Sequence, residues 1–142
     1  MNQRGVVLFG VKSPIVVEYE ETLQRCGTDL SAGVSLGGPA RLIARRKVVP
    51  VDQFSAEFSG HAFLPCAFAV ATKRSLHDQA VAMGLALHDA LIDPTAIVAA
   101  SSKIGEGSFL NAGAIIGAAS SLGRCVTVNR GSSIGHHCLV GD

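Results

Sequence analysis

The chain of 142 residues is long enough for one or two small domains, but too short to bury a large apolar core. Its 12 Lys and Arg residues nearly balance its 11 Asp and Glu residues without forming a basic block, which argues against nucleic-acid binding. We expect a cytoplasmic protein without a signal peptide or a membrane span, because no apolar run reaches the required length.

The four cysteines show neither a CxxC pair nor a spacing typical of zinc sites. Such a pattern in a cytoplasmic protein favours reduced thiols, and we expect no bound metal. The four are Cys26, Cys66, Cys125 and Cys138.

The first segment predicts a strand, a glycine turn and a helix. Residues 5–10 form an apolar run that ends in Gly10, and residues 14–26 have helical character, with Gly27 as a C-terminal stop. This order suggests the first unit of a Rossmann-like sheet, in which the free N–H groups at the helix start can receive a phosphate. Gly10 and Ser13 are therefore candidate substrate-binding residues. A purely structural turn is the alternative, because a full GxGxxG motif has three glycines and only Gly10 is present here.

The next elements extend this pattern to a small α/β domain. Residues 30–36 and 63–70 read as strands, and residues 75–83 as a helix that is capped by Ser75 and ended by Gly84. Residues 54–62 read as a loop, and residues 85–91 as a short strand. Between the predicted strands at residues 30–36 and 63–70, four basic residues at positions 41–47 mark either a ligand-binding cluster or, as we favour, a solvated face. We predict an α/β domain over residues 1–91.

Residues 92–142 carry a six-residue repeat. An aliphatic residue returns at every sixth position, and the next residue is nearly always very small or Asn. A period of six is the signature of a parallel β-helix, in which three hexapeptides make one triangular coil of about eighteen residues. The aliphatic positions are Ile92, Val98, Ile104, Leu110, Ile116, Leu122, Val128, Ile134 and Val140.

Residues eighteen apart should stack in columns with a spacing of about 4.8 Å, so the aliphatic side chains fill the inside of a prism. Small residues two positions before them suit the tight corners, and Gly and Asn suit the turns because they tolerate positive φ.

This pattern resembles the hexapeptide-repeat acyltransferases, and in particular the sialic acid O-acetyltransferase and bacillosamine-type nucleotide-sugar N-acetyltransferase group. The matching segments are residues 92–98 and 128–142, where Asn129, His136 and Cys138 have the spacing of that group's catalytic coil. The resemblance implies left-handed coils, an N-terminal domain that binds the nucleotide sugar, and a homotrimer. It further implies that acetyl-CoA and the sugar meet between neighbouring prisms, where His136 acts as the general base.

The residues around His136 agree with that role. His136 falls at a turn, two residues after Ile134, and the residues eighteen and thirty-six positions earlier are Ala118 and Ala100. These small side chains would leave a groove beneath the imidazole, which can exchange a proton near neutral pH. The alternative is a solvated surface histidine. A metal site at His136, His137 and Cys138 is not expected, because consecutive side chains diverge.

Asn129 has two interpretations. It shares a column with Asn111 and Asp93, so it is either part of a structural corner ladder or a substrate contact.

Three features depart from the family pattern. His137 stands where the family usually has an acidic residue, and Pro14 stands where it has a histidine. The family also continues for several coils that carry much of the acetyl-CoA site, whereas this sequence ends at Asp142, after just under three coils. The sequence thus predicts an acetyl-CoA-dependent acetyltransferase acting on a hydroxyl or amine of a sugar. The alternative is a truncated or non-catalytic module that binds a nucleotide sugar or trimerises.

Overall fold

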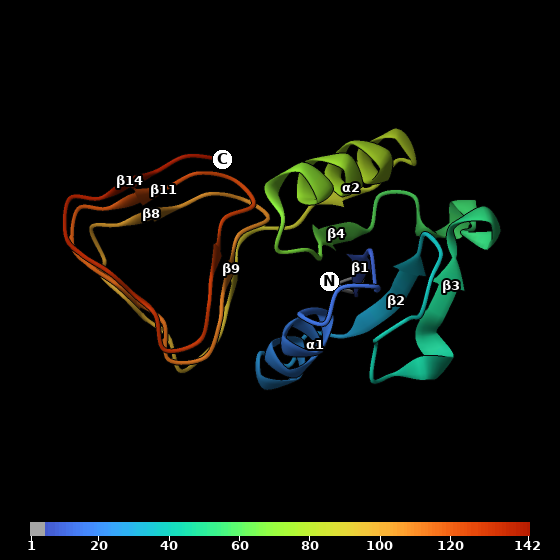
Figure 1. Ribbon diagram of the computed structural model, residues 1–142, viewed down its shortest axis with the longest axis horizontal. Coiled ribbons are helices and arrows are strands. Elements are labelled where there is room, and N and C mark those ends of the chain that lie inside the picture. The colour runs from blue at the N-terminus through green and yellow to red at the C-terminus, as the bar shows by residue number, and fades with distance from the viewer. Residues whose placement is uncertain (1–4) are drawn as a thin grey trace. The chain divides into compact units, whose positions relative to one another are not determined.

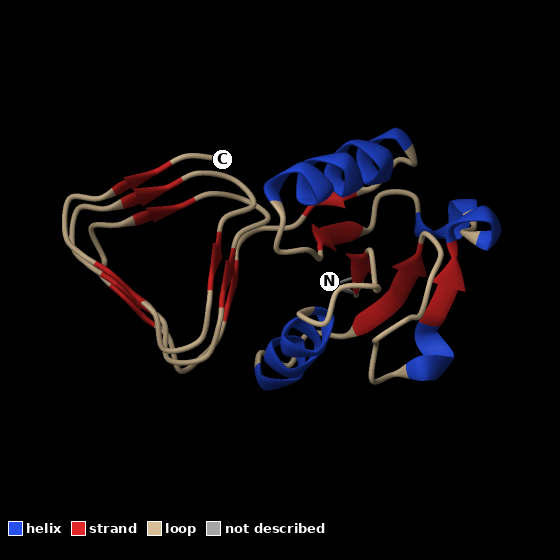
Figure 2. Cartoon of the chain, viewed as in Figure 1, coloured by secondary structure: helices blue, strands red, loops and turns tan. Residues whose placement is uncertain are grey.

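The computed structural model describes residues 5–142. The chain divides into two compact units, one that ends at His88 and one that runs from Asp89 to Asp142. Figure 2 shows that the helices lie in the first unit and that short strands and turns build the second.

The first unit contains a parallel five-stranded sheet with the order β3-β2-β1-β4-β5. The central strand β1 (Val6–Phe9) pairs with β2 (Leu30–Ser35) on one side and with β4 (Ala62–Pro65) on the other. The outer strands are β3 (Val48–Pro50) and β5 (Ala86–Leu87). Every neighbouring pair is parallel, so each connection must cross over the sheet.

Two α-helices cover this sheet, and Figure 1 shows α1 (Val16–Arg25) and α2 (Val70–Ala82) on opposite sides of it. Helix α2 buries Leu76 and Ala80 in a core cluster that includes Phe9 and Phe63. Three short 3₁₀ turns complete the unit: η1 (Arg45–Lys47), η2 (Val51–Gln53) and η3 (Ala56–Phe58). None of the helices within residues 5–142 is long and apolar enough to cross a membrane.

Helix α1 ends at the predicted stop. Gly27 has φ +66°, and its N–H donates to the carbonyl oxygen of Gln24 (3.0 Å), while the N–H of Thr28 donates to that of Leu23 (2.9 Å). This pair of bonds is the Schellman motif, in which glycine takes the left-handed conformation at low cost.

The prediction for residues 63–83 was partly wrong. Strand β4 ends at Pro65, and α2 begins at Val70, so Ser75 lies inside the helix and does not cap it. The apolar run continues from a buried strand into an exposed helix start, where Val70 is 63% exposed, and hydrophobicity alone does not mark that change. The sequence interpretation also missed β3, and it merged β5 with β6 (Leu91–Ile92).

The second unit consists of nine two-residue strands in three parallel sheets of three strands each. The middle strand of each sheet pairs with the strands eighteen residues before and after it, as in the register of Ile116 with Val98 and Ile134. Figure 1 shows the coils stacked as a triangle. The strands after β6 are β7 (Ile97–Val98), β8 (Lys103–Ile104), β9 (Phe109–Leu110), β10 (Ile115–Ile116), β11 (Ser121–Leu122), β12 (Thr127–Val128), β13 (Ser133–Ile134) and β14 (Leu139–Val140).

The interior of this unit is the predicted set of aliphatic columns. Leu110, Ile116, Leu122 and Val128 are buried, and the other five repeat positions pack against them. Small residues close the corners, and the Oγ atoms of Ser102 and Ser120 each donate a hydrogen bond of 2.7 Å to a carbonyl oxygen fifteen residues further along the chain. The repeated parallel strands are consistent with a left-handed β-helix.

Candidate functional site

His136 is exposed in the turn between β13 and β14. Main-chain bonds to the preceding coil fix this turn: the N–H of His137 donates to the carbonyl oxygen of Ala118 (2.9 Å), and that of Gly117 donates to the carbonyl oxygen of Ile134 (2.8 Å). The histidine side chain is therefore carried by a backbone that is held on both sides of the corner.

The coil beneath the histidine approaches its backbone closely. A Cβ atom added at Gly117 would lie 2.6 Å from the main-chain nitrogen of His136 and 2.6 Å from the carbonyl carbon of Gly135. Real Cβ atoms essentially never approach backbone so closely, so any other residue at position 117 would force the corner to shift. Ala118 and Ala100 are exposed on the outer surface below the turn. The groove that we expect there stays a prediction.

The neighbouring histidine contacts the His136 ring directly. The Nδ1 atoms of His136 and His137 are 2.9 Å apart, and the two rings are nearly perpendicular, with an interplanar angle of 89°. His137 has φ +55°, so its backbone is in the left-handed conformation. Such a distance between two ring nitrogens is that of a hydrogen bond.

Asn129 lies at the C-terminal end of a column of turn residues that are spaced eighteen positions apart. Its Oδ1 accepts hydrogen bonds from Asn111 Nδ2 (3.4 Å) and from the N–H of Arg130 (2.8 Å). One coil earlier, Asn111 Oδ1 accepts from the N–H of Ala112 (2.7 Å). Asp93 holds the first turn of the column through two bonds to Thr95. The structural interpretation of this column is correct, while a substrate contact by Asn129 remains a prediction.

Gly10 and Ser13, the predicted substrate-binding residues of the first unit, line one pocket of about 820 Å³. It lies where β1 and β4 end and where α1 and α2 begin, the place where ligands bind in open parallel sheets. Gly10 has φ +89°, and a Cβ atom there would lie 2.7 Å from Leu76 Cδ1. Pro14, which replaces the family histidine, also lines this pocket.

The remaining lining of the pocket combines charge, apolar surface and amides. Lys12 runs along Gly38, and Phe68 leaves 58% of its surface exposed. On α2, Gln79 Nε2 donates to Ser75 Oγ (3.1 Å). Ala69, the N-cap residue of α2, makes no side-chain cap, so the first N–H groups of that helix can bind an anion. At the start of α1, the N–H of Val16 instead donates to the carbonyl oxygen of Ser13 (3.1 Å).

Sequence reasoning missed two of these residues for different reasons. Lys12 lies between the two predicted residues, and its positive charge could have indicated a phosphate-binding role. Nothing in the sequence indicated such a role for Phe68, because it lies in a segment that was predicted as a buried strand.

Two side chains of the basic cluster at residues 41–47 donate hydrogen bonds to main-chain carbonyl oxygens. Arg45 Nη1 donates to the carbonyl oxygen of Ala40 (3.0 Å), and Lys47 Nζ donates to that of Leu30. The Glu20 carboxylate accepts the N–H groups of Ile43 (2.6 Å) and Ala44 (2.9 Å). These contacts agree with the interpretation of a structural, solvated face.

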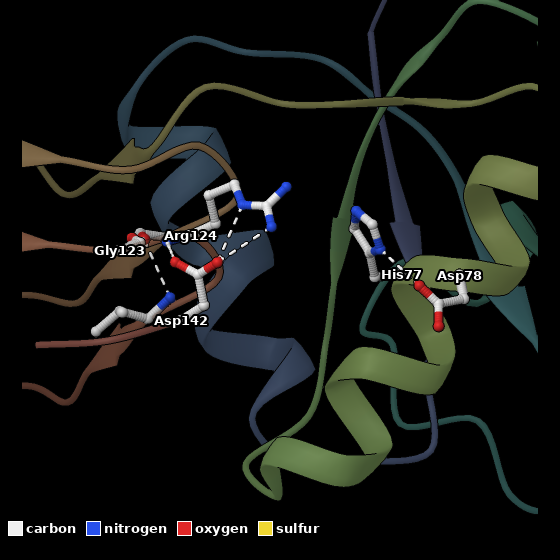
Figure 3. A network of polar contacts seen from close by, with 7 residues as sticks. His77, Asp78, Gly123, Arg124 and Asp142 are labelled. Carbon is white, nitrogen blue, oxygen red and sulfur yellow. Dashed lines mark hydrogen bonds and ion pairs between the residues drawn. The ribbon is translucent and has the colours of Figure 1, made fainter.

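Other ionisable groups form contacts elsewhere in the described part of the chain. Figure 3 shows an exposed contact on α2 between His77 Nδ1 and Asp78 Oδ1 (3.0 Å), and the ion pair of Arg124 with Asp142 (3.1 Å). All four cysteines are free, and burial raises the pKa of the Cys66 thiol far above its ordinary value. Within residues 5–142, no three side chains of the metal-binding types form a cluster.

The fold and the turn geometry define the chain as a parallel β-helix protein with an α/β unit, and solved structures of this class resemble it. One is a histidine-to-alanine variant of GDP-perosamine N-acetyltransferase from Caulobacter crescentus in complex with CoA and GDP-perosamine. It is 26% identical with a TM-score of 0.82, and the match covers 97% of this chain and 66% of that chain. The asparagine variant of the same histidine gives the same coverage, 26% identity and a TM-score of 0.83.

A third similar structure is the acetyltransferase domain of PglB from Neisseria gonorrhoeae in complex with acetyl coenzyme A. It is 25% identical with a TM-score of 0.78, and the match covers 99% of this chain and 68% of that domain. No protein-family model and no curated protein sequence matches the chain. The resemblance to hexapeptide-repeat nucleotide-sugar N-acetyltransferases is thus confirmed, and this chain spans 66% of the length of the two perosamine N-acetyltransferase structures.

Proposed function

We propose that the protein transfers the acetyl group of acetyl-CoA to the amine of a nucleotide-linked amino sugar. The observation that carries this proposal is the turn at His136, an exposed histidine held on a β-helix corner. The bound CoA and GDP-perosamine of the similar structures support the two substrate classes, and their N-acetyltransferase activity favours an amine over a hydroxyl as the acceptor.

The first unit is the nucleotide-sugar-binding part of this proposal. Its strand order, β3-β2-β1-β4-β5, agrees with a Rossmann-like sheet, and its pocket lies at the carboxyl ends of the central strands. The Lys12 ammonium and the N-terminus of α2 suit a diphosphate, and the exposed ring of Phe68 offers a surface on which a nucleobase can stack. We assign Gly10 and Ser13 as phosphate-side contacts in the first unit and Asn129 as a substrate contact in the second unit.

The second unit supplies the chemistry. The Nε2 atom of His136 takes a proton from the sugar amine while the amine nitrogen attacks the thioester carbonyl carbon. The carbon–sulfur bond then breaks, and the imidazolium returns the proton to the departing thiolate, which gives CoA thiol and an N-acetyl sugar. A main-chain N–H at a glycine-rich corner stabilises the developing oxyanion.

We further propose that the protein works as a homotrimer in the cytoplasm. The exposed outer faces of the prism support the trimer, since Ile97 and Leu139 are 65% and 85% exposed. Four free cysteines agree with a reducing compartment.

Release of CoA thiol tests the proposal. The full-length protein is incubated with acetyl-CoA and a series of nucleotide amino sugars, and the thiol and the acetylated sugar are both measured. We expect turnover that falls roughly 10²- to 10⁴-fold in His136→Ala, because a positioned base contributes about that much. His77→Gln on α2 is the matched control and should retain full turnover. Unchanged turnover in His136→Ala would reject His136 as the base.

A binding module without catalysis is the second candidate, and the pocket in the first unit favours it because that pocket is built within one unit of the chain. It predicts calorimetric binding of a nucleotide sugar with no thiol release from acetyl-CoA by the full-length protein.

A further inference from the structure

The ring nitrogens of His136 and His137 lie within hydrogen-bond distance of each other. Their Nδ1 atoms are 2.9 Å apart, the ring centroids are 5.1 Å apart, and the rings meet edge to face. A neutral imidazole protonates one nitrogen and leaves a lone pair on the other. At this distance, one Nδ1 carries the hydrogen and the other accepts it.

The two arrangements have opposite chemical consequences. If His136 Nδ1 carries the hydrogen, the lone pair of that ring lies on Nε2, where it can take a proton from a substrate. If His137 Nδ1 carries it, His136 is protonated on Nε2 and cannot act as a base there. The hydrogen bond of one ring nitrogen thus sets the chemistry of the other.

We propose that His137 is a positioning residue, whose Nδ1 accepts the Nδ1–H of His136 and so places the reactive lone pair on His136 Nε2. This inference rests on the proposed acyl transfer. When Nε2 takes the proton of the attacking amine, the ring becomes a cation, and its Nδ1–H bond to neutral His137 becomes charge-assisted and stronger. His137 thus orients the base, as a carboxylate does in other enzymes, but without a negative charge.

The fold holds His137 in place for this task. Its N–H donates to the carbonyl oxygen of Ala118 (2.9 Å), and its left-handed φ of +55° repeats that of Ala119 (+57°), eighteen residues earlier in the same column. Cys125 has the same conformation at another corner, with φ +56°. An alanine is therefore accommodated at this turn, so His137→Ala removes the acceptor without demanding a new backbone.

The direct test is the tautomer of His136, observed by long-range ¹⁵N–¹H NMR of protein with labelled histidine at about pH 8.5, where histidine rings are ordinarily neutral. We expect the hydrogen on Nδ1 in the unaltered protein and a loss of that preference in His137→Ala. His137→Asn should restore it, because the amide oxygen accepts a hydrogen bond and Asn tolerates the left-handed conformation. Cys125→Ala is the matched control and should leave the tautomer unchanged.

Turnover of the full-length protein separates this inference from the proposed function. We expect kcat to fall roughly 10- to 100-fold in His137→Ala with an unchanged KM, and to recover in His137→Asn. Hydrogen on Nε2 of His136 in the unaltered protein, or on Nδ1 regardless of position 137, overturns the positioning role. The expected tautomers without any thiol release would support the pair and reject acyl transfer instead.

Discussion

The two units both use parallel strands, but they bury them differently. In the β-helix, each strand contributes one inward side chain, such as Ile116, to a single interior that is filled by stacked columns of aliphatic residues. In the α/β unit, β1 is buried on both faces, and α2 contributes Leu76 and Ala80 to the core on one of them. A side chain in the thin prism therefore has no second layer behind it. We therefore expect the effect of a substitution on stability to differ more between inward, outward and corner positions in the β-helix than in the α/β unit.

The largest expected effect comes from a charge inside the prism. Ile116→Asp places a carboxylate at a position that is 1% exposed, between Val98 and Ile134 of the same column. An unpaired buried charge should lower the free energy of unfolding by more than about 3 kcal/mol. Ile115→Asp, the matched outward neighbour at 43% exposure, should change it by less than about 1 kcal/mol. Denaturant unfolding followed by circular dichroism measures both, and equal losses would contradict the inward register.

A smaller effect is expected at the corner that carries His136. In Gly117→Ala, the new methyl group would lie 2.6 Å from backbone atoms of the next coil, so the corner must shift at a cost of about 1–3 kcal/mol. Gly135→Ala is the control one coil later, where the nearest atom would be Cys138 Sγ at 3.8 Å. We expect the first variant to lose stability and turnover together and the second to unfold like the parent. A stable, fully active Gly117→Ala protein would show that the coils are further apart.

The smallest effect concerns the layered unit. Desolvation by burial raises the pKa of the Cys66 thiol from its ordinary value of 9.0, so the folded protein keeps this proton where the unfolded chain releases it. The stability that Cys66 contributes is complete below pH 9.0 and is lost as the pH rises above it, by about 1.4 kcal/mol per pH unit. Unfolding of the parent and of Cys66→Ala between about pH 8 and pH 10 should show a steeper decline in the parent. The exposed Cys26→Ala control should decline like the parent, and identical slopes in all three would contradict the burial effect.

The same contrast explains what the sequence could predict. In the β-helix, the neighbour of each strand lies eighteen residues away, so columns such as Val98, Ile116 and Ile134 are readable from a period alone. In the α/β unit, the partner of β1 is set by long connections, and the end of β4 at Pro65 depends on its pairing with Phe9. No local pattern records that pairing, so residues 66–70 were wrongly assigned to the strand.

The candidate site divides in the same way. The resemblance to the family's catalytic coil implied His136 and Asn129, and the structure places both in turns of the prism. Its contact with His137 was not predictable, because it requires the left-handed backbone at position 137. The strand-to-helix pattern predicted Gly10 and Ser13 as binding residues. The pocket that they share with Phe68 and Gln79 could not be predicted, because only the folded sheet brings these segments together.

Steady-state kinetics of two variants of the full-length protein test most directly the claim that one unit binds the nucleotide sugar and the other performs proton transfer. Lys12→Ala removes the exposed ammonium of the pocket, and His136→Asn removes the base while keeping a polar side chain of similar reach. We predict that Lys12→Ala raises KM for the nucleotide sugar roughly tenfold with little change in kcat, and that His136→Asn lowers kcat at least roughly 100-fold with KM nearly unchanged. An unchanged KM in Lys12→Ala together with an unchanged kcat in His136→Asn would contradict the account.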